Sequence, residues 1–226
     1  MAHSLRLARW QAALRAPGCP VCRLAQEAGR DFLVNVLREG KAHELVYRHI
    51  RDAGGFCEDH TRFLRQLAAK RPGDRRCIDR LYGWLLGDLV SGPAPREPCP
   101  GCQAAEKCER VSLATLRDVL HPHSGDPDLR GQIERGEGLC REHLVRAASR
   151  IEDGESLRLL IDAHARAWDM LSHDLKEYLR KHDYRFSHEA KTPVEEQSWV
   201  QAVASISGTQ CVSSLRRAME QNNEPD

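Results

Sequence analysis

Two kinds of short motif in this sequence carry side chains that bind metals. The first, CPxC, occurs as "CPVC" at 19–22 and as "CPGC" at 99–102. The second, CxxH, occurs within "GGFCEDH" at 54–60 and within "GEGLCREH" at 136–143. Three thiolates and one imidazole in a tetrahedron are a ligand set that zinc takes at structural sites. The motifs therefore predict metal binding.

The two motifs occur twice in the same order, which indicates an internal duplication. The copies lie 80 residues apart at the first cysteine of CPxC and 83 apart at the histidine of CxxH. The turn "HPHSGDPD" at 121–128 can absorb the difference, because loops tolerate insertions. A single CxxC is weak evidence for a metal site, whereas an ordered pair repeated at nearly equal spacing is hard to obtain by accident.

Each motif brings its two ligands to one face if its first cysteine precedes a helix, because residues three apart on a helix are neighbours. Proline at the first helical position is favourable, and the helix N-terminus lowers thiol pKa values. We predict one site formed by Cys19, Cys22, Cys57 and His60, and a second formed by Cys99, Cys102, Cys140 and His143. Pairing within each copy is an assumption, because ligands exchanged between copies would give the same counts.

The predicted metal is Zn²⁺, two per chain. Four protein ligands leave no open position for water or substrate, so the metal is expected to be structural. Structural zinc contributes on the order of 10–16 kcal/mol in small peptides, which is comparable to the whole stability of a domain, about 5–15 kcal/mol. We expect a scaffold or adaptor that binds another macromolecule, most simply a protein, rather than an enzyme.

Two redox alternatives use the same cysteines. CPxC resembles the active-site motif of thioredoxin-like oxidoreductases, but that motif follows a buried strand, and here a Pro-Gly break after a helix precedes it. An iron–sulfur cluster is the other alternative, because three cysteines and one histidine can also ligate iron. The remaining cysteines have no repeat counterpart and are predicted to be buried free thiols: Cys77, Cys108 and Cys211. For Cys108, six residues after Cys102, a role as an extra ligand or as a resolving thiol stays open.

The charge distribution gives a weaker third alternative. Residues 1–90 hold 16 Lys and Arg against 10 Asp and Glu, whereas the whole chain has a net charge of +1. A basic half is compatible with nucleic-acid binding, which would depend on salt. A solvated surface explains the same asymmetry without any partner.

The apolar residues recur at helical spacing, so the chain is predicted to be all-α. We expect helices near 5–14, 20–40, 42–52, 57–70, 76–90 and 100–120, a short one ending near 134, one from 140, one after 154 and one over 193–207. The helix after 154 has the longest periodic run, with a coiled-coil-like seam formed by Leu157, Ile161, His164, Trp168, Leu171, Leu175 and Tyr178. His164 in this seam is predicted to be a hydrogen-bonded core residue.

This periodicity, with the Pro-rich joint "SGPAPREP" at 91–98, suggests four parts. Residues 1–90 would form the first helical metal-binding repeat and 91–153 the second. Residues 154–210 would form C-terminal helices packed on both repeats, and 211–226 a partly disordered tail. The N-terminus has no uninterrupted apolar core of a secretory signal, and no stretch approaches the length of a membrane span. We expect a cytoplasmic protein without a membrane partner, in which reduced cysteines serve as ligands.

The combination of "CPVC…FCEDH" and "CPGC…LCREH" with a late helix containing "SWVQAVASISG" resembles an uncharacterised bacterial family. That domain of unknown function is marked by repeated CPxC and CxxH motifs and by a C-terminal helix that carries a tryptophan. The resemblance covers roughly residues 10–208. It implies a helical metal-binding protein of prokaryotic origin and brings no established activity.

Overall fold

A computed structural model describes residues 2–38, 44–70, 73, 75–91, 97–123, 126–186 and 188–208. Over these residues the chain is helical and contains no strand, which confirms the all-α prediction. The helices are α1 (Ala2–Leu14), α2 (Pro20–Arg38), α3 (Glu44–Asp52), α4 (Glu58–Lys70), α5 (Arg75–Ser91), α6 (Pro100–Leu120), α7 (Pro127–Arg135), α8 (Arg141–Ala148), α9 (Gly154–Arg180) and α10 (Pro193–Ser207). The predicted tail at 211–226 and most of the joint at 91–98 lie outside the described residues.

Proline and short polar residues set the helix starts. Proline is the first residue of α2, α6, α7 and α10, where its fixed φ suits the helix and its missing N–H is not needed. At α10, Thr192 and Glu195 form a capping box in which each side chain accepts a hydrogen bond from the other residue's backbone N–H. Gly208 ends this helix with a φ of 80°, a conformation that favours glycine.

The described chain divides into two compact units that do not follow the four predicted parts. The first unit joins Met1–Leu24 to Glu109–Asp226, and the second is Ala25–Cys108. Helix α2 therefore begins in the first unit and continues in the second, and α6 does the reverse.

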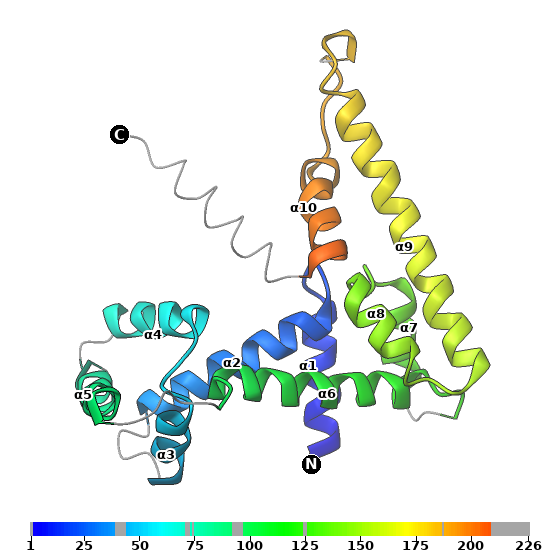
Figure 1. Cartoon of the computed structure of the whole chain (residues 1–226). Helices are drawn as coiled ribbons and strands as arrows, with labels where there is room; N and C mark the ends of the chain where they lie inside the picture. Colours follow the sequence, from blue (N-terminus) through cyan, green and yellow to red (C-terminus); the bar gives the residue numbers. More distant parts are fainter. Residues whose placement is uncertain are drawn as a thin grey trace. The chain divides into compact units, whose positions relative to one another are not determined.

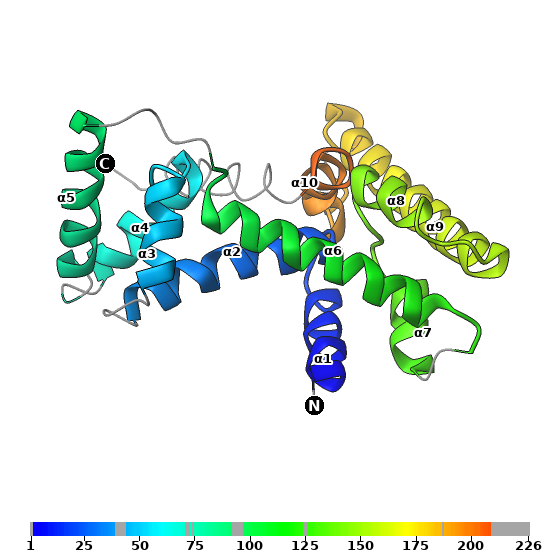
Figure 2. The same cartoon turned by 60° about the horizontal axis from the view of Figure 1, so that its bottom comes forward.

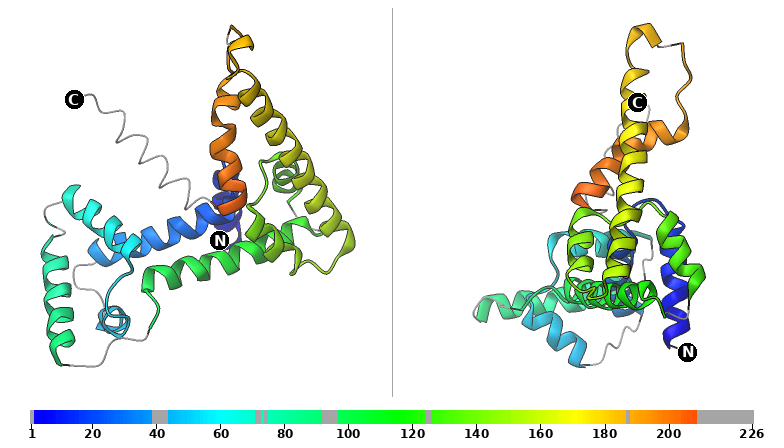
Figure 3. Two further views of the ribbon diagram at one scale, coloured as in Figure 1. Left: turned by 45° about the horizontal axis from the view of Figure 1, so that its top comes forward. Right: turned by 90° about the vertical axis from the view of Figure 1, so that its right-hand side faces the viewer.

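In the first unit, α10 contacts α9 and α8, and α7 contacts both α1 and α9; Figures 1 and 3 show α9 and α10 diverging from the turn that joins them. An ion pair between Lys181 Nζ and Glu195 Oε1 at 2.7 Å links the end of α9 to the start of α10. In the seam predicted for α9, His164 is buried and five residues are half-buried, but the side chain of Ile161 is 49% exposed. Leu160 and Ala163 are buried with His164 instead, so the buried stripe passes beside Ile161.

In the second unit, α3, α4 and α5 gather around the second half of α2 (Figure 2). Two buried clusters hold them together: one consists of Leu33, Leu37 and Leu64, and the other of Val36, Tyr47, Ile50, Leu81 and Leu85. No metal-ligand candidate belongs to these clusters. The unit therefore has an apolar core of its own.

Over the described residues of the whole chain, no helix is long and apolar enough to cross a membrane.

Candidate metal centres

The eight predicted ligands come together in two groups, but not in the predicted pairs. Cys19 and Cys22 lie with Cys140 and His143, and we call this group the Cys19 site. Cys57 and His60 lie with Cys99 and Cys102, and we call this group the Cys57 site. In each group the candidate ligand atoms all lie within 4.8 Å of one another. The assumed pairing within each sequence copy is wrong: every site takes CPxC from one copy and CxxH from the other.

Helix lengths explain the exchange. Helix α2 has 19 residues, about 28 Å at 1.5 Å per residue. Helix α3 has only 9 residues, so it is too short to return the chain to the start of α2. The CxxH motif of the first copy instead reaches the middle of α2, where His60 lies against Gly29. In the second copy, likewise, His143 lies beside Glu109 in the middle of α6.

All four motifs begin in the same way. The carbonyl oxygen of the first cysteine accepts a hydrogen bond from the N–H four residues later, as in Arg23 to Cys19 at 3.2 Å and Leu144 to Cys140 at 2.9 Å; the same bond runs from Thr61 to Cys57 and from Gln103 to Cys99. Each first cysteine thus stands at the N-cap of its helix, as the sequence predicted. For Cys140, the side chain makes no cap hydrogen bond, so its sulfur stays available to the site.

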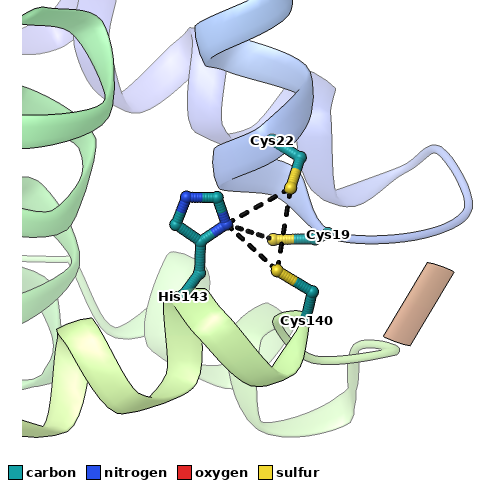
Figure 4. A group of neighbouring side chains, drawn as sticks. All are labelled: Cys19, Cys22, Cys140 and His143. Atoms are coloured by element: carbon teal, nitrogen blue, oxygen red, sulfur yellow. Dashed lines mark hydrogen bonds between the residues drawn. The ribbon is translucent and has the colours of Figure 1, made fainter. Parts of the chain in front are cut away.

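The Cys19 site is the more enclosed of the two, and Figure 4 shows its four side chains facing one another. Its Nδ1 atom, on His143, is 3.2 Å from the sulfurs of Cys22 and Cys140 and 3.5 Å from that of Cys19. The sulfurs of Cys22 and Cys140 are 3.7 Å apart. Cys19 is 3% exposed, Cys140 2% and His143 7%. Two helix starts, those of α2 and α8, supply all four groups.

The Cys57 site has the same arrangement but a more open surface. Its histidine Nδ1, on His60, is 3.1 Å from the Cys57 sulfur and 3.6 Å from those of Cys99 and Cys102. The Cys57 and Cys102 sulfurs are 3.6 Å apart. Cys102 is exposed, and the other three ligands are half-buried.

These distances fit a single tetrahedral zinc ion. With Zn–S bonds of about 2.3 Å and Zn–N bonds of about 2.0–2.1 Å, the edges of the tetrahedron are about 3.8 Å between sulfurs and about 3.5 Å between sulfur and nitrogen. The sulfur–sulfur distances of 3.7 and 3.6 Å lie close to the first value. A multi-iron cluster would spread its ligands over different iron atoms, whereas here one point is within reach of all four.

In each site, burial and the neighbouring sulfurs raise the pKa of one cysteine thiol. Burial raises the pKa of the Cys19 thiol far above its ordinary range, and hydrogen bonds and repulsion from Cys140 and Cys22 raise it further. Burial, followed by hydrogen bonding to Cys57 and the charge of Cys99, raises the pKa of Cys102 to about 12. For His143, burial lowers the pKa, but the sulfurs of Cys140 and Cys22 outweigh it and raise the pKa to about 10. A bound divalent cation reverses this effect, because a coordinating thiol is deprotonated.

A carboxylate supports the histidine of the Cys19 site. Glu109 Oε1 lies 3.5 Å from His143 Nε2, and Arg146 Nη1 donates a hydrogen bond to the same oxygen. Such a carboxylate orients a metal-bound imidazole and increases its basicity. The sequence motifs did not predict Glu109. Its only sequence signal is its place ten residues after Cys99, which corresponds to Gly29 in the first copy.

Replacing Glu109 by glutamine is expected to lower zinc affinity at the Cys19 site by about 10- to 100-fold, the usual effect of losing such a partner. Competition with a chelator of known affinity measures the change. Glu142→Gln is the matched control, because Glu142 also pairs with Arg146, at 3.7 Å, but is exposed on the helix surface. Equal affinities in both variants would show that Glu109 does not support the metal.

The histidine of the Cys57 site is positioned by glycines instead. A Cβ atom added at Gly29 would lie 2.6 Å from His60 Nε2, and one added at Gly101 would lie 2.6 Å from His60 Cδ2. Contacts this short do not occur for real side chains. The His60 ring therefore occupies space that exists only because both helices have glycine there. Over the described residues, no carboxylate pairs with His60 in the way that Glu109 does with His143.

Several other predicted residues lie outside the two groups. His164 accepts a hydrogen bond at its Nε2 from the Leu139 N–H, and its Nδ1 lies 2.8 Å from the Leu160 carbonyl oxygen, so it is a core histidine. This contact fixes the backbone just before Cys140. Cys77 packs against the Leu33 cluster, and Cys108 belongs to neither metal group; both are half-buried rather than buried. Cys211 lies outside the described residues.

Comparisons with known proteins add no assignment to this geometry. No family model matches the chain, and neither a curated protein nor a solved structure matches it. The two sites and the helices that they connect are therefore the features that bear on function.

Proposed function

We propose that this protein is a zinc-stapled helical scaffold that binds another macromolecule, with one structural Zn²⁺ in each site. The observation that supports the proposal most directly is that each group contains a complete set of four zinc ligands. Three sulfurs and one nitrogen surround one point, at spacings that suit a zinc tetrahedron. Such a set fills the coordination sphere of zinc, so the metal serves the fold and not a reaction.

Each proposed metal would connect segments that are far apart in the sequence. The Cys19 site joins residues 118 to 124 positions apart, and contacts in the Cys57 site span up to 45 positions. Cross-links over long stretches of chain stabilise a fold by removing freedom from the unfolded state. In this proposal the zinc ions hold the ends of α2 and α6 in place, and the remaining helix faces are free to bind a partner.

Exposed apolar side chains support a protein as the partner. On α5, Leu86 and Val90 are exposed and lie four residues apart, so they share one face of the helix. An exposed apolar patch of this kind is typical of surfaces that bind other proteins. Cysteines kept as metal ligands also suit a reducing compartment, so we place the scaffold in the cytoplasm, consistent with the bacterial family that the sequence resembles.

The redox alternatives receive less support. A thioredoxin-like site needs its two thiols free to form a disulfide beside a strand, whereas each CPxC pair here faces a third sulfur and an imidazole, and the described residues contain no strand. An absorbance spectrum of protein purified without oxygen separates the metals, because zinc is colourless and iron–sulfur clusters absorb visible light. Iron with a visible band would replace the zinc proposal.

Zinc content in two double variants tests the sites and their pairing together. Cys19→Ser with Cys140→Ser removes two ligands from one site, so we expect one zinc per chain to remain. Cys19→Ser with Cys57→Ser removes one ligand from each site, so we expect both zinc ions to bind weakly or to be lost. Pairing within sequence copies predicts the reverse pattern. Elemental analysis after dialysis distinguishes the two patterns.

A further inference from the structure

The two sites differ in their protection from solvent, although they have the same ligand types. In the Cys19 site, three of the four ligands are buried. The fourth, Cys22, lies against the backbone of Gly208 at the end of α10: a Cβ added there would be 3.3 Å from the Cys22 sulfur and 3.9 Å from that of Cys140. The end of α10 therefore covers this site, and Gly208 is itself buried.

No ligand of the Cys57 site is buried to this extent. Cys102 is exposed, while Cys57 and Cys99 are half-buried. The exposed sulfur of Cys102 lies 3.6 Å from the sulfur of Cys57. A cysteine is oxidised more readily when its sulfur is a thiolate and when solvent can reach it. A metal-bound thiolate at the surface with a second thiolate beside it meets both conditions.

We propose that the Cys57 site is a hydroperoxide-reactive site that releases its zinc on oxidation, whereas the Cys19 site keeps its zinc. This inference rests on the proposed function, because it requires zinc in both sites. It assigns the two metals different roles: one is a permanent staple and the other is a releasable one. The reacting pair is Cys102, which meets the oxidant, and Cys57, which resolves the oxidised sulfur.

The reaction has two displacement steps. The Cys102 thiolate attacks one oxygen of the hydroperoxide; an S–O bond forms, the O–O bond breaks, and hydroxide or alkoxide leaves. The Cys57 thiolate then attacks the Cys102 sulfur; an S–S bond forms, the S–O bond breaks, and hydroxide leaves. Two thiolates together lose two electrons, and one hydroperoxide gains two. The zinc is left with Cys99 and His60 as ligands, which are too few to hold it.

The consequence of release is local. The buried clusters around Leu33 and Ile50 contain no ligand of this site, so α2 to α5 keep their apolar core after the zinc leaves. What is lost is the link between the start of α4, where Cys57 lies, and the start of α6, where Cys99 and Cys102 lie. Oxidation therefore frees the beginning of α6 without unfolding the second unit.

The test uses the full chain, purified without oxygen, and follows zinc release with a colorimetric chelator after addition of hydrogen peroxide. We expect one equivalent of zinc to leave at least about tenfold faster than the other, as the difference in thiolate access requires. Mass spectrometry of the early product should find a disulfide between Cys57 and Cys102. Equal release rates for both zinc ions, or an early disulfide among Cys19, Cys22 and Cys140, would overturn the inference.

Two variants test which site releases the faster of the two equivalents of zinc, called the fast phase. Cys102→His keeps four ligands but removes the exposed thiolate, so the fast phase should disappear. Cys108→Ala removes a half-buried thiol that belongs to neither site and should leave the fast phase unchanged. A fast phase that survives Cys102→His would contradict the proposal, and the comparison of rates in the unmodified chain depends on neither variant. Two zinc ions that leave together overturn only this inference, whereas a chain without zinc overturns the proposed function as well.

Discussion

Replacing Cys140 by serine is expected to remove one zinc per chain and to unfold much of the first unit. Cys140 is 2% exposed and supplies one of three sulfurs to the Cys19 site. A structural zinc contributes on the order of 10–16 kcal/mol in small peptides, against about 5–15 kcal/mol for the total stability of a domain. The free energy lost with this ion should therefore exceed the stabilisation that the helices of the first unit obtain from packing alone. These helices are α1, α7, α8, α9 and α10.

The measurement combines zinc analysis with thermal unfolding followed by circular dichroism. We expect a reduced helical signal at 25 °C and a separate, later transition from the second unit, whose apolar clusters do not involve this site. Cys108→Ala is the control, because Cys108 is a half-buried cysteine outside both sites; it should change the free energy of unfolding by about 1 kcal/mol. Full helical content after loss of the zinc would show that the metal is not a staple.

The sequence predicts the helices of this protein well because their limits are set locally. Prolines at 20, 100, 127 and 193 stand at helix starts, and Gly208 stands at a helix end. These signals act through φ angles and missing N–H groups, which do not depend on distant contacts. The position of the ligands within each motif is local in the same way, so all eight candidate residues could be named from the sequence.

The pairing of the motifs could not be predicted in the same way. It depends on the lengths of α2 and α3, because the short helix cannot bring Cys57 back along the longer one to Cys19. Pairing within copies and pairing between copies use the same motifs at the same positions. The spacing of the motifs therefore cannot distinguish the two pairings. An estimate of both helix lengths would have favoured exchange, since a CxxH motif that cannot reach the CPxC motif of its own copy must pair with that of the other copy.

The residues that support the ligands could not be predicted from the sequence either. Glu109 and Gly29 occupy equivalent places, ten residues after the first cysteine of each copy. One is a charged residue and the other has no side chain, so the repeat comparison shows no shared feature. Each matters only because a histidine from another helix lies against it. Ile161 was misplaced for a related reason: helical spacing defines a stripe, but the neighbours of α9 decide where its edge lies.

Replacing Gly29 by alanine is expected to lower zinc affinity at the Cys57 site by about 10- to 100-fold, the range seen when the support of a ligand is lost. In an open helix position the same change stabilises by about 0.4–1 kcal/mol, because alanine loses less backbone entropy on folding. Here the new Cβ would lie 2.6 Å from His60 Nε2 and 3.1 Å from the Gly101 carbonyl oxygen. His60 must therefore move, and a moved imidazole no longer completes the tetrahedron.

Gly83→Ala is the matched control, because Gly83 also lies within a helix of the second unit and a Cβ there meets nothing within 4 Å. It should raise the thermal midpoint and leave zinc affinity unchanged, whereas Gly29→Ala should lower both. A rescue separates steric displacement of His60 from general damage to α2. Adding His60→Cys to Gly29→Ala removes the ring that the new methyl group meets and supplies a fourth thiolate, so zinc should bind again. Failure of this rescue, with α2 still folded, would mean that Gly29 acts on the site through something other than the His60 ring.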